Sequence, residues 1–146
     1  MPAQPPTPQE RANVAAGLQR VIDALTSNPQ WNEANQNPTL FYVWDFTQNS
    51  LKRLADYENI QAGRPVQHPE QFRGGAGSGN AAALKVFQDV CSRTMMLDML
   101  VNDTTGKAGM ITGAGGALDF GQEARDAVAA LSEACPDEHV MAGMMA

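Results

Sequence analysis

A run of apolar residues at helical spacing, preceded by a strong start signal, is the feature that most constrains how this chain folds. Thr7-Pro8-Gln9-Glu10 has the composition of a capping box, with a Thr cap, a Pro at the first helical position and a Glu three residues after the cap. The apolar residues that follow recur every three or four positions: Val14, Leu18, Val21, Ile22 and Leu25. This spacing predicts an amphipathic helix that begins at residue 8 and ends at the breakers of 27–29.

A second helix is predicted over residues 38–58, although its first part is ambiguous. Asn37-Pro38 again places a capping residue before a proline. Residues 40–46, LFYVWDF, hold four of the nine aromatic residues of the chain and favour a strand by propensity. Apolar residues nevertheless continue at helical spacing, at Leu40, Trp44, Leu51 and Leu54. We therefore prefer a helix.

Two further helices are predicted in the second half of the chain. Over residues 81–102 one broad face is apolar, as expected of a central helix: Leu84, Phe87, Val90, Cys91, Thr94, Leu97 and Val101. Asp119 and Gln122 then resemble a second capping box. A last apolar stripe follows and stops at Pro136: Phe120, Ala124, Ala127, Val128, Leu131 and Cys135.

Long connections separate these helices. Residues 60–79 hold seven Gly and Pro residues, and the run 74–79 has the composition of a flexible linker, natural or engineered. Residues 104–118 form a second, Gly-rich loop. The sequence therefore predicts a mainly α-helical fold, a small bundle of about four helices with long Gly/Pro-rich connections. We expect a single domain over 1–146, which begins with a Pro-rich arm (1–6) and ends with a Met-rich tail (136–146).

The net charge of −6 lies in the last third of the chain. Residues 1–97 carry eight acidic and eight basic residues, whereas residues 98–146 carry eight acids against Lys107 and Arg125. Because affinity for nucleic acid comes mainly from Lys and Arg on phosphates, we expect no nucleic-acid partner. No apolar run approaches the roughly 20 residues that span a membrane, and no signal peptide is visible. We expect a protein of the cytoplasm or of an assembled particle.

Asp98 is a possible buried acid. On the wheel of the third predicted helix it falls between Phe87 and Cys91, inside the apolar face. A buried carboxylate must pair or become neutral, so we predict that Asp98 is at least partly buried and hydrogen-bonded. A structural pair with Arg20 or Arg64, or exposure near the helix end, is favoured over a role as a site acid, because no second acid or base accompanies it.

Residues 112–118, TGAGGAL, precede a predicted helix and are similar in composition to a dinucleotide-binding loop. In such a loop glycines let backbone N–H groups approach phosphates. Only 30 residues follow Gly116, too few for the rest of a doubly wound sheet, and Asp119 places a negative charge where a phosphate would bind. A flexible connection is favoured, and we predict no cofactor.

Two cysteines and two histidines are the possible metal ligands or nucleophiles. Cys135 and His139 are four residues apart, and Cys91 and His68 could complete four ligands. Pro136 interrupts the helix that would align the first two, and no Cys-x-x-Cys pair is present, so no metal site is predicted. A disulfide between Cys91 and Cys135 stays open. Nothing places a histidine beside either thiol, so catalysis by a Cys-His pair has no support.

Methionine is concentrated in the last third of the chain, where seven of the eight lie at or after residue 95. Methionine is flexible and is common at adaptable binding surfaces. Some of these residues point away from the main face of the third helix, and others crowd the last residues. The predicted interaction residues are Met96, Met99, Leu100, Met141, Met144 and Met145. The alternative is that the last segment of the chain covers the second face of the third helix.

The preferred function is that of a non-enzymatic protein that binds other protein subunits, copies of itself included, as a structural subunit of a virion or secretion-type complex does. No catalytic residue is predicted. The alternative is a small enzyme or ligand-binding domain that uses Asp98 and the Gly-rich 104–118 loop. A large complex would favour the first function, and a monomer with a deep pocket at Asp98 would favour the second.

Overall fold

The computed structural model describes residues 5–28, 31, 38–67, 80–102 and 120–145. These residues form five helices and no strand. The helices are α1 (Pro8–Thr26), α2 (Pro38–Gln61), α3 (Asn80–Val101), α5 (Gln122–Ala134) and α6 (Asp137–Met145). The mainly helical bundle is therefore confirmed, with five helices rather than four.

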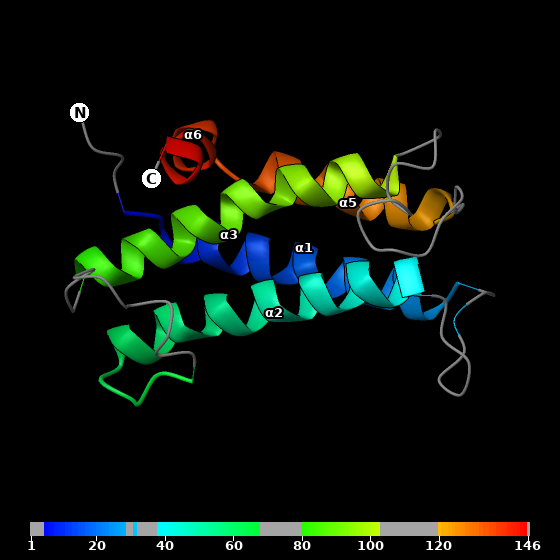
Figure 1. The fold of residues 1–146 in the computed structure, drawn as a ribbon. Coiled ribbons are helices and arrows are strands. Elements are labelled where there is room, and N and C mark those ends of the chain that lie inside the picture. The colour runs from blue at the N-terminus through cyan, green and yellow to red at the C-terminus, as the bar shows by residue number, and fades with distance from the viewer. Residues whose placement is uncertain (1–4, 29–30, 32–37, 68–79, 103–119, 146) are drawn as a thin grey trace.

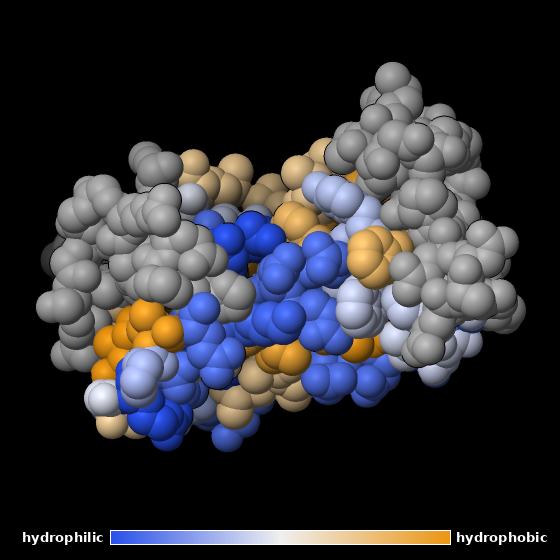
Figure 2. Space-filling view, turned by 60° about the horizontal axis from the view of Figure 1, so that its bottom comes forward, coloured by the Kyte–Doolittle hydropathy of each residue, from blue (hydrophilic) through white to orange (hydrophobic). Residues whose placement is uncertain are grey.

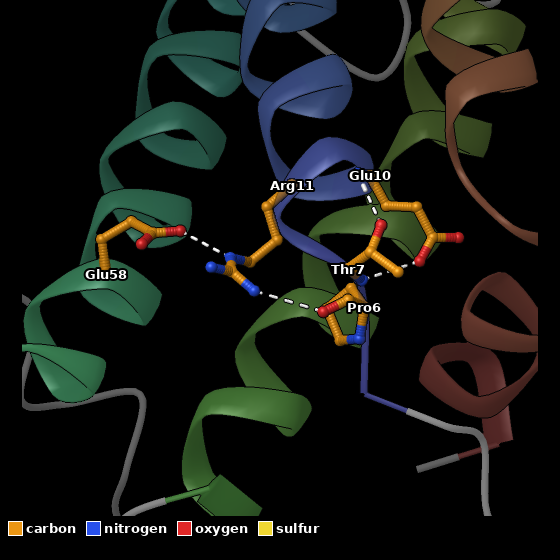
Figure 3. Close-up of polar contacts among 5 residues, drawn as sticks. All are labelled: Pro6, Thr7, Glu10, Arg11 and Glu58. Carbon is orange, nitrogen blue, oxygen red and sulfur yellow. Dashed lines mark hydrogen bonds and ion pairs between the residues drawn. The ribbon is translucent and has the colours of Figure 1, made fainter.

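α1 begins at the predicted capping box. Thr7 Oγ1 accepts a hydrogen bond from the backbone N–H of Glu10 at 3.0 Å, and the backbone N–H of Thr7 donates to Glu10 Oε1 at 2.8 Å (Figure 3). All five residues of the predicted apolar stripe are buried. In the same turn Arg11 Nε lies 2.6 Å from Glu58 Oε1 of α2, and Arg11 Nη1 donates to the Pro6 carbonyl at 3.2 Å. Arg11 thereby joins the start of α1 to α2.

α2 is helical throughout residues 40–46, so the strand alternative is wrong. Most of its buried residues follow helical spacing: Leu40, Val43, Thr47, Ser50, Leu54 and Tyr57; Asp56 is buried as well. The two buried hydroxyls are satisfied within the helix, because Thr47 donates to the Val43 carbonyl at 2.8 Å and Ser50 to the Phe46 carbonyl at 3.1 Å. Packing of this face against α1 and α3 outweighs the strand propensity of the aromatic run.

α2 ends at Gln61, three residues beyond the predicted boundary, and Gly63 follows the helix end. Its φ is 70°, a conformation that glycine adopts without strain. The N–H of Arg64 donates to the Asn59 carbonyl at 2.8 Å and the N–H of Gly63 to the Ile60 carbonyl at 3.2 Å, the pattern of a Schellman motif. Of the predicted loop 60–79, residues 60–61 thus belong to α2. The rest of that loop from 68 onward, and the predicted loop 104–118, lie outside the described residues.

The beginnings of α5 and α6 differ from the prediction. α5 has Gly121 as its N-cap, two residues after the predicted cap at Asp119, which lies outside the described residues. The Met-rich tail predicted over 136–146 is largely a helix, because α6 occupies most of it. Pro136 stops α5 but also starts α6, since its carbonyl accepts the N–H groups of His139 and Val140 at 3.0 and 3.1 Å. Acidic residues in the first turn of α6, Asp137 and Glu138, suit its helix dipole.

α3 is the central helix, as predicted. It packs on α2, α5 and α6, while α1 packs on α2 and α5. Figure 1 shows α2 and α3 side by side and antiparallel, with α6 crossing α3 on the side away from α2. α6 approaches α3 closely at Gly143, where an added Cβ would overlap the Gln88 carbonyl and meet Ser92 at 2.8 Å. A side chain at this position would force the two helices apart.

Candidate interaction surface

Four methionine side chains are exposed on α3 and α6. The exposed fractions are 45% for Met95, 63% for Met99, 56% for Met141 and 55% for Met144. We call these four residues the methionine surface. Three of them were predicted interaction residues, and Met95 was missed because the helical wheel placed it with the buried face.

The position of α6 explains why Met95 and Met99 are exposed. Gln88, Ser92, Met95 and Met99 follow one another at spacings of four, three and four along α3, so they form one stripe of the helix. α6 covers the first half of this stripe, where Gly143 rests on Gln88 and Ser92. The described helices leave the second half, Met95 and Met99, open to solvent.

A groove of about 460 Å³ runs between α3, α5 and α6 beside these methionines. It is open to solvent, and its lining residues are Thr94, Met95, Asp98, Met99, Ala129, Ser132, Asp137 and Val140. Met141 lies one helical turn after Asp137, and Met144 one turn after Val140. The two methionines of α6 are thus exposed on the helix whose Asp137 and Val140 line the groove.

Asp98 is exposed, so the prediction of a buried acid is wrong. Its carboxylate accepts a hydrogen bond from Asn102 Nδ2 at 3.0 Å, at the end of α3. The helical wheel failed because the neighbours of α3 change along its length. Phe87 and Cys91 lie on the same side of α3 as Asp98, and both are buried against other helices. Asp98 lies two turns after Cys91, where that side of α3 is exposed to solvent. Asp98 is therefore exposed near the end of the helix, which is the alternative given above.

Leu100 is buried, so its assignment to an intermolecular surface is wrong. It lies seven residues after Arg93, on the same side of α3. Arg93 faces α2, since its Nε donates to Ser50 Oγ at 3.1 Å and its guanidinium lies 4.1 Å from the centre of the Phe46 ring. The side of α3 that carries Arg93 thus faces α2, whereas Met99 stays exposed. Met96 is half-buried against the same core.

The last predicted interaction residue, Met145, is the final residue of α6, and its side chain lies outside the described part of the structure.

Burial lowers the pKa of Arg93, and the neighbouring charge of Arg53 lowers it further. Arg93 therefore has the surroundings of a structural cation between two helices.

The other described exposed apolar side chains are separate from the methionine surface. Phe41 and Tyr42, on the first turns of α2, are 37% and 38% exposed. Figure 2 brings the α2 side of the molecule forward and shows mainly hydrophilic residues across the middle of that face. A second open groove lies between α1 and α2, lined by the stems of Arg11 and Glu58 and by small apolar residues. The ion pair between Arg11 and Glu58 in Figure 3 forms part of its lining.

Cys91 and Cys135 meet in the core. Both are buried free thiols. The neighbouring Cys135 thiol, together with burial, raises the pKa of Cys91. The neighbouring Cys91 thiol lowers the pKa of Cys135. The sequence placed both cysteines on apolar stripes, but only the packing of α3 against α5 brings them together.

His139 is also buried, and its ring meets the Phe87 ring edge-on at 5.0 Å between centroids. Its Nε2 is 3.8 Å from Glu138 Oε1, and its Nδ1 has no hydrogen-bond partner within the described structure. Among the described residues no three His, Cys, Asp or Glu side chains are placed to hold a metal ion. His68, the fourth possible ligand, lies outside them.

Comparison with known proteins gives no match to a family model, to a curated protein or to a solved structure. Within the described residues, no helix is both long and apolar enough to cross a membrane. The arrangement of side chains on the surface is therefore the basis for a functional proposal.

Proposed function

We propose that this protein is a non-enzymatic interaction protein that binds another protein subunit through the methionine surface. One observation carries the proposal: Met95 and Met99 line an open groove, and Met141 and Met144 are exposed on α6, one of the three helices that form it. The other described apolar residues of α3 are buried or half-buried, so its exposed apolar surface is confined to Met95 and Met99.

Contact with a partner would remove these methionine side chains from water, which lowers the free energy of the complex. Burying a methionine side chain contributes roughly 1.5–3 kcal/mol relative to leaving it in water. Four of them in one region form a larger apolar surface than scattered single residues do, and such surfaces mark interaction sites. Methionine suits this role because its unbranched side chain adapts to the shape of a partner.

The shape and charge of the groove indicate the kind of partner. The groove lies between helices, and a further helix could lie along it with an apolar ridge against Met95 and Met99. Asp98 and Asp137 line the same groove, and neither is buried. An amphipathic helix with Lys or Arg beside its apolar ridge would pair with these carboxylates. The partner we propose is therefore a basic amphipathic helix, on another protein or on a second copy of this chain.

Membership of a virion or secretion-type complex is the narrower form of this proposal and stays a prediction. The alternative of an enzyme or ligand-binding domain has less support. Asp98 is solvated in an open groove rather than at the base of a deep pocket. The other part of that alternative, the 104–118 loop, lies outside the described residues.

The test is a variant in which all four methionines of the surface are replaced by Gln. Because each is exposed, the variant should fold normally, which circular dichroism and thermal unfolding would check. Binding of the partner isolated with the protein from its native source, or self-association measured by sedimentation, should weaken by about 100-fold or more. The matched control replaces Phe41 and Tyr42, the exposed aromatics of α2, with Gln.

The proposal requires that the control keep its binding. Undiminished binding by the folded methionine variant would reject the methionine surface as the binding site. Equal loss in the control variant would also reject it, because the effect would then follow any loss of exposed apolar area.

A further inference from the structure

We propose that the methionine surface is a reversible oxidation site, at which a peroxide converts the exposed thioethers to sulfoxides and thereby releases the bound partner. The release rests on the proposed function, because it requires that a partner binds there. The oxidation rests only on where the methionine side chains lie. Met95, Met99, Met141 and Met144 are exposed, whereas Met96 is half-buried against the core.

The reaction needs a peroxide and no other group of the protein. A lone pair of the thioether sulfur attacks one oxygen of hydrogen peroxide, the O–O bond breaks and an S–O bond forms. The hydroxide that leaves takes the proton of the transferred oxygen and becomes water. The sulfur loses two electrons, the peroxide gains them, and the methionine gains one oxygen atom.

Exposure to solvent decides which methionines react first. Met95 and Met96 are adjacent on α3, but Met95 lines the open groove and Met96 packs against the core. Met99 lines the same groove one helical turn after Met95. A peroxide reaches an exposed sulfur directly from solvent, whereas it reaches a packed sulfur only when the fold opens locally. We therefore expect the methionine surface to oxidise before Met96.

The same exposure separates the effect on binding from the effect on the fold. A sulfoxide is polar, and it disrupts packing wherever a methionine lies in a core or in an apolar interface. The four exposed side chains lie outside the buried core, so their oxidation should leave the helices intact. They supply the apolar contact with the proposed partner, so the same oxidation should remove that contact.

The first experiment maps oxidation in the purified full chain. After brief treatment with hydrogen peroxide, peptide mass spectrometry measures the fraction of sulfoxide at each methionine. We expect the four residues of the methionine surface to react severalfold faster than Met96, with the midpoint of thermal unfolding unchanged. In urea, Met96 should react as fast as the others. An equally fast reaction of Met96 in the folded chain, or unfolding that accompanies oxidation of the four, would overturn the oxidation site.

The second experiment measures binding to a synthetic amphipathic helix that has a ridge of leucines flanked by lysines. The untreated chain should bind this peptide, and the peroxide-treated chain should bind it about 100-fold more weakly. Treatment with the two methionine sulfoxide reductases, one for each configuration at sulfur, should restore binding. The matched variant replaces the four methionines of the surface with Leu. Because it keeps an apolar surface without a thioether, peroxide should leave its binding unchanged while its other methionines oxidise.

Separate outcomes contradict the proposed function and its control by oxidation. Absence of binding before oxidation, in both the unchanged chain and the Leu variant, would reject the proposed function and the release with it. Binding that survives full oxidation of the four methionines would reject the release alone. Loss of binding by the peroxide-treated Leu variant would also reject the release, because oxidation elsewhere in the chain would then be responsible.

Discussion

His139 is a buried residue with one polar atom that lacks a hydrogen bond within the described structure. Its ring is buried against Phe87, and Nδ1 has no hydrogen-bond partner among the described residues. An unsatisfied buried polar atom costs about 1–3 kcal/mol of desolvation. We predict that His139→Leu leaves the free energy of unfolding unchanged or raises it by about 1 kcal/mol, because Leu fills the site without a polar atom.

The matched variant for this prediction is His139→Ala, which removes the ring and leaves a cavity against Phe87. It should lower the free energy of unfolding by about 2–5 kcal/mol. Urea unfolding of both variants measures the two effects. A loss for His139→Leu as large as the loss for His139→Ala would mean that the imidazole has a polar partner that stabilises the fold.

For single residues, helical spacing in the sequence predicted the apolar face of a helix more reliably than it predicted which residues other helices bury. The stripe of α1 is buried as predicted, and α2 and α5 pack on this helix. Asp98 and Leu100 were both assigned to the wrong surroundings. Each assignment used one wheel for the whole of α3, although α2, α5 and α6 all pack on this helix. The sequence alone does not reveal where a neighbouring helix ends.

Among the elements, α6 depends most on a single residue. Gly143 allows its backbone to rest on the Gln88 carbonyl, and a Cβ at this position would overlap that oxygen. We predict that Gly143→Ala moves α6 away from α3, at a cost of roughly 1–3 kcal/mol in the free energy of unfolding. Hydrogen exchange should show lost protection of the α6 amides, while the amides of α1 and α2 keep theirs.

Met144→Ala is the control for this element, since it changes the adjacent residue on an exposed side of the same helix. It should leave the exchange of the α6 amides almost unaltered. If Gly143→Ala also left α6 as protected as before, the close approach to Gln88 would not be what holds the helix in place.

Start and stop signals explain how well each element could be predicted. α1 has a full capping box, and both of its reciprocal hydrogen bonds form. α6 was missed because Pro136 was interpreted only as the end of α5, although a proline can equally precede a new helix. The aromatic run of α2 was ambiguous because strand propensity is a weak preference that tertiary packing overrides.

For the whole molecule, the negative charge and the exposed methionines lie in the same part of the chain, its last third. Residues 98–146 carry the entire net charge of the chain. Asp98 and Asp137 of that segment line the groove that Met95 and Met99 flank. The concentration of methionine was visible in the sequence. The groove was not, because it forms only where α3, α5 and α6 meet.

The central claim is that the methionine surface contacts another protein, and site-specific photo-crosslinking in the native source tests it most directly. A photoreactive amino acid replaces Met99 in one variant and Lys52, an exposed residue of α2, in the other. We predict that the probe at position 99 gives a discrete cross-linked product of defined mass and that the probe at position 52 does not. The same product in equal yield from both positions, or no product from position 99, would contradict the claim.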